Sequence, residues 1–129
     1  MPHRIIETTE APQAIGPYSQ AICAGNMTFL SGQIALDPES GVLVGEGDVA
    51  AQTLQVMKNL RAVLRAADHE MSDVVKVTIF LSDLGDFSVV NALYAEAMGE
   101  HRPARATVEV SRLPKDVAVE IDAIAVKGR

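Results

Sequence analysis

Polar and apolar positions in the first third of the chain follow the short alternation that is typical of β-strands. Residues 4–7 predict a short strand, and residues 11–17 contain two prolines and a glycine, which indicate an irregular loop. The β-prone runs 19–24 and 27–31 are separated only by Gly25 and Asn26. Because these two residue types favour tight turns between strands, the pattern predicts a β-hairpin.

Two later stretches have the three- and four-residue spacing of amphipathic helices. The first is expected to begin at Asp48, a good N-cap that ends a turn-rich loop over residues 37–47. Its recurring apolar positions are Val56, Met57, Leu60, Val63, Leu64 and Ala67. The second covers residues 87–98, with Gly99 at the expected C-cap. Its inward positions are expected to be Val90, Leu93, Tyr94 and Ala97.

Three further strands are expected in the second half of the chain. Residues 73–81 are rich in β-branched side chains and predict a mostly buried strand, followed by a turn at 83–86. Residues 106–110 and 117–126 predict the last two strands, joined by a turn at 112–116. The order of elements predicts one α+β domain over residues 1–129, with two helices packed on one face of a mixed β-sheet.

Composition and charge narrow the classes of partner. The chain has 129 residues, of which 48% are hydrophobic but only 4% aromatic, and its formal net charge is −6. An acidic chain without a run of Lys or Arg is a poor match for nucleic acid or for anionic membranes. An anionic ligand would therefore have to be bound by a local positive group, which draws attention to single arginines.

Arg105 and Glu120 are the first candidates for chemistry. Arg105 follows Pro103 and Ala104 and immediately precedes a predicted strand, and its guanidinium suits bidentate binding of a carboxylate. The alternative is a surface ion pair. Glu120 and Asp122 share one face of the predicted strand 117–126, where a carboxylate is either exposed, paired, or raised in pKa and available for proton transfer. From spacing alone, a solvated face is the more common explanation for Glu120.

Metal, redox and membrane functions have little support in the sequence. His3, His69 and His101 lie far apart without metal-ligand spacing, and His69 is expected to end a helix. The single cysteine, Cys23, cannot form an intramolecular disulfide. Residues 1–10 do not resemble a signal peptide, and no apolar run approaches the roughly 20 residues of a membrane span. A cytoplasmic protein without metal or other cofactor is expected.

Three sequence blocks resemble the Rid family of reactive intermediate deaminases, also called the YjgF family. They are GPYSQAI at residues 16–22, FLSGQIALDP at 29–38 and PARATVEVSRLPKDVAVEIDAIAV at 103–126. The resemblance covers nearly the whole chain. It implies a chorismate-mutase-like fold and a homotrimer with sites between adjacent subunits. It also implies cofactor-independent hydrolysis of reactive enamines and imines of amino acids to 2-oxo acids and ammonia.

The resemblance also implies roles for individual residues. Arg105 corresponds to the arginine that binds the substrate carboxylate, and Glu120 to the acid that positions and activates water. Thr107 departs from the family pattern, in which cysteine is common at this position, and is expected to shape substrate preference. His101 and Arg102 stand where an aromatic residue is common. Further pocket positions implied by the resemblance are Tyr18, Ser31, Gly32 and Asn91.

These observations lead to one principal hypothesis and two alternatives. The principal hypothesis is a deaminase of 2-iminobutanoate and 2-iminopropanoate, with a small carboxylate-bearing imine, enamine or 2-oxo acid as ligand. Thr107 leaves open a related deaminase with another substrate, such as 2-aminomuconate. The other alternative is a ligand-binding or stress-related protein with chaperone-like, translation-inhibiting or RNA-cleaving activity. The net charge of −6 argues against RNA as a partner.

Overall fold

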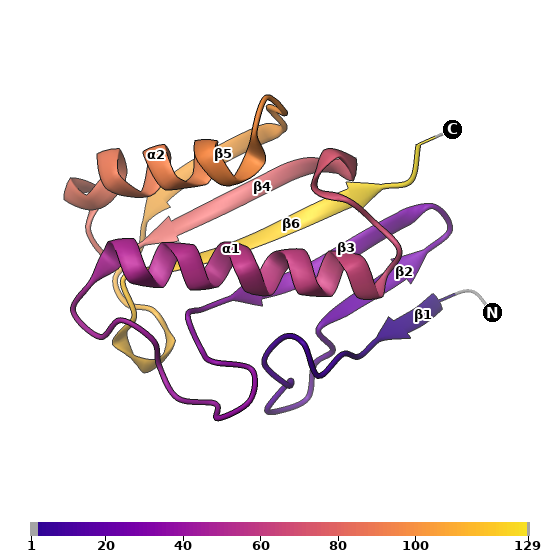
Figure 1. Ribbon diagram of the computed structural model, residues 1–129, viewed down its shortest axis with the longest axis horizontal. Coiled ribbons are helices and arrows are strands. Elements are labelled where there is room, and N and C mark those ends of the chain that lie inside the picture. Colours follow the sequence, from indigo (N-terminus) through magenta and orange to yellow (C-terminus); the bar gives the residue numbers. More distant parts are fainter. Residues whose placement is uncertain (1–2, 129) are drawn as a thin grey trace.

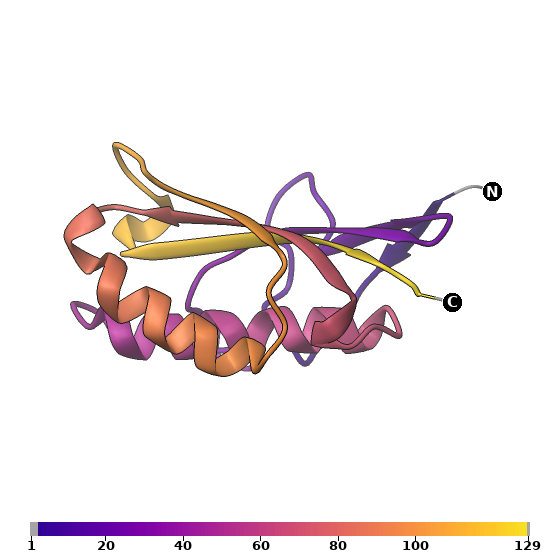
Figure 2. The same ribbon diagram turned by 90° about the horizontal axis from the view of Figure 1, so that it is seen from above.

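The computed structural model describes residues 3–128 and forms one six-stranded sheet with two helices on a single face (Figures 1 and 2). The strands are β1 (His3–Ile6), β2 (Ala21–Ala24), β3 (Met27–Gln33), β4 (Val74–Leu81), β5 (Ala104–Glu109) and β6 (Val119–Val126). The helices are α1 (Val49–Ala66) and α2 (Phe87–Met98), with short 3-10 turns at Met71–Asp73, Leu84–Asp86 and Pro114–Asp116. The predicted α+β class and the placement of both helices on one face are confirmed.

The sheet has the strand order β1-β2-β3-β6-β4-β5. Only β4 and β5 pair in parallel, and α2 makes the crossover between them. The last strand, β6, lies between β3 and β4 and pairs antiparallel with both. Consequently β5 is an edge strand, and β4 alone lies between it and β6 (Figure 1).

Helix α1 begins and ends as its local sequence dictates. The Asp48 carboxylate accepts a hydrogen bond from the Ala51 backbone N–H at 3.1 Å, so the predicted N-cap is confirmed. At the other end Asp68 takes a left-handed conformation with φ 63°, and its N–H donates to the Arg65 carbonyl. The N–H of His69 donates to the Leu64 carbonyl, which completes a Schellman motif.

His69 was expected to end a helix, but it lies beyond the cap of α1 and is buried. Its Nε2 lies 2.8 Å from the Thr28 hydroxyl, and its Nδ1 lies 3.1 Å from an Asp73 carboxylate oxygen. The ring therefore joins β3 to the turn before β4. A buried polar ring with both nitrogens partnered is a structural element of the core.

The core fills the space between the helices and the sheet. The apolar face of α1 is buried as predicted, with Val56 and Val63 fully enclosed. In α2 the fully buried residues are Val90, Tyr94 and Met98. Leu93 and Ala97, which were expected to point inward, are only partly buried. Helix α2 is short and lies near the edge of the sheet, so its flanks remain accessible.

Several strand boundaries differ from those expected. Strand β1 lies one residue earlier than predicted, and β3 continues through a register shift between Leu30 and Gln33. Strand β5 begins at Ala104 rather than at residue 106, because its parallel pairing with β4 already starts at Lys76. Arg105 is therefore part of the strand, and its direction is fixed by the sheet.

Both helices lie on one side of the sheet, and no helix covers its other face (Figure 2). Exposed apolar side chains lie on this uncovered face. Phe29 is 44% exposed, Ile5 59% and Val108 41%, and these residues come from β3, β1 and β5. Ile5 and Phe29 lie in one row across β1, β2 and β3, because both pair with Ile22. Exposed apolar rows of this kind are typical of interaction surfaces.

Asn59 connects α1 to the loop that follows β3, and its removal is expected to destabilise the fold. It is fully buried, and its amide donates to the carbonyls of Ile34 and Leu36 at 3.2 and 3.0 Å. We expect Asn59→Ala to lower the free energy of unfolding by about 2–4 kcal/mol, because two buried carbonyls lose their donor. Urea denaturation at fixed protein concentration measures this change. Gln55→Ala is the control, since it removes only the bond from Gln55 Nε2 to Asn59; equal effects of the two substitutions would contradict the prediction.

Candidate functional site

Arg105 and Glu120 point to opposite faces of the sheet. In the register of β4 with β5, Arg105 pairs with Val77, which is 3% exposed and faces the helices. Glu120 pairs with Phe80 and alternates with the buried residues of β6, so it lies on the face away from the helices. Within one chain these two candidate residues therefore lie at two separate places, each of which we name a half-site because it holds one of the two residues.

The first half-site, which we call the arginine half-site, is built around Arg105 by one face of α2. The Arg105 Nη1 donates to the Asn91 side-chain oxygen at 2.7 Å. Its guanidinium carbon lies 5.2 Å from the ring centroid of Tyr94 and 5.7 Å from that of Phe87. Cation–π contacts and a hydrogen bond from one helix hold a long, flexible side chain in one orientation. Sequence reasoning found Asn91, and it placed Tyr94 in the core without recognising its contact with Arg105.

A surface hollow of about 570 Å³ opens beside this arginine. It is lined by Asn91, Tyr94, Ala95, Arg102, Pro103 and Arg105. Thr107 follows Arg105 on the same side of β5, because its strand partner Ile79 is buried beneath the helices. Among residues 3–128, the buried hydroxyl groups of Tyr94 and Thr107 have no hydrogen-bond partner. The arginine half-site therefore combines a fixed positive charge with unsatisfied polar groups.

The second half-site, which we call the glutamate half-site, lies where β3 and β6 meet. Its hollow of about 540 Å³ is lined by Tyr18, Ser31, Gly32 and Glu120, with Lys115 and Pro114 at the turn before β6. Gly32 lies in the register shift of β3, and a Cβ at this position would overlap the Glu120 Oε2. The glycine therefore makes the space that the carboxylate occupies. The structure brings together four of the predicted site residues here.

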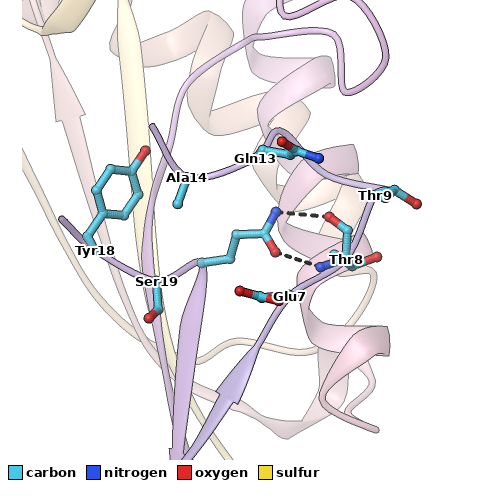
Figure 3. A pocket seen from close by; sticks show the side chains of 8 residues that line it. Glu7, Thr8, Thr9, Gln13, Ala14, Tyr18 and Ser19 are labelled. Atoms are coloured by element: carbon cyan, nitrogen blue, oxygen red, sulfur yellow. Dashed lines mark hydrogen bonds between the residues drawn. The ribbon is translucent and has the colours of Figure 1, made fainter. Parts of the chain in front are cut away.

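The loop that presents Tyr18 is ordered by its own hydrogen bonds. The buried Gln20 side chain accepts from the Thr8 N–H at 2.7 Å and donates to the carbonyls of Thr8 and Pro12. Figure 3 shows the two bonds to Thr8, with Tyr18 on the opposite side of a neighbouring hollow. Ser31 adds a bond from its hydroxyl to the Ser19 carbonyl at 2.6 Å. Ser31 therefore helps to fix the loop that carries Tyr18.

The surroundings of the Glu120 carboxyl change its pKa. Burial raises the pKa of Glu120 above its ordinary value of 4.5, and the negative charge of Asp122 raises it further. Of the three alternatives for this carboxylate, exposed, paired or raised in pKa, its partial burial favours the raised pKa. Lys115 also lines this hollow, whereas the sequence indicated only that it lies in the turn 112–116. Its backbone has a positive φ of 55°, which is uncommon outside glycine.

Among the described residues, no group of three or more His, Cys, Asp or Glu side chains is arranged to hold a metal ion. A search of the same residues finds no helix that is long and apolar enough to span a membrane. The two half-sites contain the groups that carboxylate binding and proton transfer require, namely a fixed guanidinium and a carboxyl with a raised pKa.

Comparisons with known proteins agree with this architecture. A family model described as Endoribonuclease L-PSP matches residues 8–127. A RutC family protein of Pyrococcus horikoshii is 55% identical over 123 residues, covering 95% of this chain and 97% of that protein. The 2-iminobutanoate/2-iminopropanoate deaminase of Escherichia coli K12 is 49% identical over 127 residues, covering 96% and 98%.

Solved structures match the whole fold. The crystal structure of a putative endoribonuclease from Thermotoga maritima superposes with a TM-score of 0.94 at 51% sequence identity, covering 98% of each chain. The structure of Escherichia coli TdcF with bound serine has a TM-score of 0.92 at 44% identity, covering 97% of this chain and 99% of TdcF. The chain therefore belongs to the Endoribonuclease L-PSP family, the YjgF or Rid family that its three sequence blocks resemble.

Proposed function

We propose that this protein is a hydrolytic deaminase of small 2-imino acids, with 2-iminobutanoate and 2-iminopropanoate as substrates. The observation that carries the proposal is the fixed Arg105 guanidinium, held by Asn91 and two aromatic rings beside an open hollow. Such an arginine suits the carboxylate of a 2-imino acid. The deaminases of Escherichia coli and Salmonella typhimurium, 49% and 48% identical, support the same substrate class.

The reaction requires a correctly oriented substrate and the transfer of protons. The imine carbon is already electrophilic, so water adds to it, the carbon–nitrogen bond breaks, and the products are a 2-oxo acid and ammonia. Arg105 would fix the carboxylate and thereby the position of the imine carbon. Glu120 would accept a proton from the attacking water and return it to the leaving nitrogen. The raised pKa of Glu120 suits both steps, because it brings the carboxyl closer to working pH.

The complete site would require two copies of the chain. Since Arg105 and Glu120 lie on opposite faces of one sheet, a single chain offers only one half-site on each face. The exposed apolar face that carries Phe29 and Ile5 favours association through the same side as Glu120. A homotrimer with three equivalent interfaces would then join each arginine half-site to the glutamate half-site of a neighbouring subunit.

Several alternative functions are also considered, and the imine assay described below distinguishes the proposed deaminase from them. The family description names an endoribonuclease, and a RutC family protein is among the similar relatives. The net charge of −6 is unfavourable for RNA binding. A related deaminase that acts on 2-aminomuconate, and a ligand-binding, chaperone-like or translation-inhibiting protein, are the remaining alternatives.

The direct test is an imine competition assay. A threonine dehydratase generates 2-iminobutanoate in the presence of semicarbazide, which traps the imine before it hydrolyses. The purified protein is expected to lower the amount of trapped imine and to raise the yield of 2-oxobutanoate. An unchanged amount of trapped product at micromolar protein would rule out the proposed activity. Measurable RNA cleavage under the same conditions, without imine hydrolysis, would favour the ribonuclease alternative.

The pH dependence of the reaction is expected to depend on Asp122. Glu120 must be ionised to accept a proton, and its pKa is raised above 4.5, so activity should fall as pH decreases through a midpoint above 4.5. Replacing Asp122 with asparagine removes the negative charge that raises this pKa, and the midpoint of the acid limb should move to lower pH. The profile of kcat/KM against pH measures the shift. Asp68→Asn, at the end of α1, is the control and should leave the midpoint in place; a shift to higher pH in Asp122→Asn would contradict the assignment of Glu120.

A further inference from the structure

The arginine half-site contains a second arginine that the proposed reaction does not use. Arg102 lines the same hollow as Arg105, three residues away along the chain. An extended chain advances at most about 3.5 Å per residue, so the two backbones are at most about 10 Å apart, a separation that two arginine side chains can span. The hollow therefore has positive groups at two points.

Both guanidinium groups are held through the same nitrogen, Nη1. Arg102 Nη1 donates to the carbonyls of Gly99 and His101 at 2.6 and 2.9 Å, whereas Arg105 Nη1 donates to Asn91 at 2.7 Å. Among residues 3–128, the hydrogen bonds of these two arginines use Nη1. An arginine has a second edge, formed by Nε and Nη2, that matches a carboxylate. Each arginine can therefore present this edge while its other nitrogen stays fixed.

The two arginines of this hollow form no ion pair with an acid among residues 3–128. Burial raises the pKa of the Tyr94 phenol, and the charges of Arg105 and Arg102 both oppose this rise, so both arginines act on the same ring. In a chain with net charge −6, two uncompensated arginines in one hollow concentrate positive potential locally.

We infer that Arg102 is a specificity-determining residue that binds the second carboxylate of a dicarboxylic 2-imino acid, such as 2-iminosuccinate. This inference rests on the proposed deaminase function and refines its substrate class. Arg105 holds the carboxylate next to the imine carbon, and Arg102 holds the distal carboxylate at the rim of the hollow. Water adds to the imine carbon and ammonia leaves as before, so 2-iminosuccinate gives oxaloacetate and ammonia without any oxidant.

The test compares two imines with one set of variants. An L-aspartate oxidase generates 2-iminosuccinate and a threonine dehydratase generates 2-iminobutanoate, each in competition with semicarbazide. The wild type is expected to have the higher kcat/KM for the dicarboxylic imine. In Arg102→Gln the ratio of the two kcat/KM values should fall about tenfold, as expected for the loss of a charge-assisted hydrogen-bonded pair. Arg102→Lys should retain part of the preference, because it keeps the charge without the second edge.

A purely structural role of Arg102 gives a different result. Its bonds to Gly99 and His101 lie just beyond the end of α2, so their loss alone would lower thermal stability and leave the substrate ratio unchanged. Arg61→Gln, an exposed arginine on α1, is the matched control. An unchanged ratio in Arg102→Gln, or a wild-type preference for 2-iminobutanoate, would overturn the inference.

A binding measurement separates failure of this inference from failure of the proposed function. The dissociation constants of 2-oxoglutarate and 2-oxobutanoate are measured by calorimetry for the wild type and for Arg102→Gln. If the protein hydrolyses neither imine, the deaminase proposal fails. Tighter binding of 2-oxoglutarate that is lost in Arg102→Gln would then still support Arg102 as the second carboxylate site, and equal binding of both acids would refute it.

Discussion

Replacing Arg105 with alanine is expected to reduce kcat/KM for 2-iminobutanoate hydrolysis by roughly 100-fold or more. Two hydrogen bonds between a guanidinium and a carboxylate contribute about 3 kcal/mol or more together, which corresponds to at least this factor. The loss should appear in both KM and kcat, because the same contact binds the substrate and orients its imine carbon. Steady-state kinetics in the semicarbazide assay measure both parameters.

Two variants identify the physical cause of this loss. Arg105→Lys keeps the charge but cannot reproduce the cation–π contacts with Tyr94 and Phe87 together with a bidentate pair, so it should also lose most activity. Arg61→Ala removes an exposed arginine from α1 and should match the wild type. Activity of Arg105→Ala within about threefold of the wild type, below the size of one charged hydrogen bond, would contradict carboxylate binding by Arg105.

Replacing Glu120 with glutamine is expected to abolish most activity while leaving substrate binding largely intact. Glutamine has nearly the same shape, so it should fit the space above Gly32, but it cannot accept a proton from water. Loss of a general base typically reduces the rate about 100- to 10,000-fold. The effect should therefore fall on kcat, which distinguishes Glu120 from Arg105.

Mixing these two inactive variants is expected to restore activity. If Arg105 and Glu120 act across subunits, an interface is complete when Glu120→Gln supplies the arginine half-site and Arg105→Ala supplies the glutamate half-site. In randomly reassembled oligomers from equal amounts of both variants, about one quarter of the interfaces meet this condition, since each half-site is intact in half of the subunits. Unfolding, mixing and refolding the variants, followed by the imine assay, measures the recovered fraction.

The control for complementation is a mixture of Arg105→Ala with the double variant Arg105→Ala/Glu120→Gln. Neither partner offers an intact arginine half-site, so this mixture should stay inactive. Sedimentation should give three times the mass of one chain for the wild type and for each variant. Lack of recovery in the first mixture, with trimers present, would mean that the two residues do not complete a site across the interface.

The secondary structure of this protein is largely readable from local sequence. The helix start at Asp48 and the extent of α2 were predicted correctly, because caps and helical periodicity depend on residues that are neighbours in the chain. The alternation of β6, with Glu120 and Asp122 on one face, was also predicted correctly. The start of β5 was wrong by two residues, since its boundary depends on pairing with the distant strand β4.

The sequence by itself determined the class of fold, the family resemblance and the identity of the two charged candidates, Arg105 and Glu120. Only the tertiary structure decided on which face of the sheet each of these side chains lies and what surrounds it. The register of β5 against β4 pairs Arg105 with the buried Val77, and a shift of one residue would have turned its side chain to the other face. Packing likewise raised the pKa of Glu120, because burial is a property of the assembled sheet. Local patterns specify elements and residue chemistry, whereas the face and the environment of each side chain are set by non-local pairing.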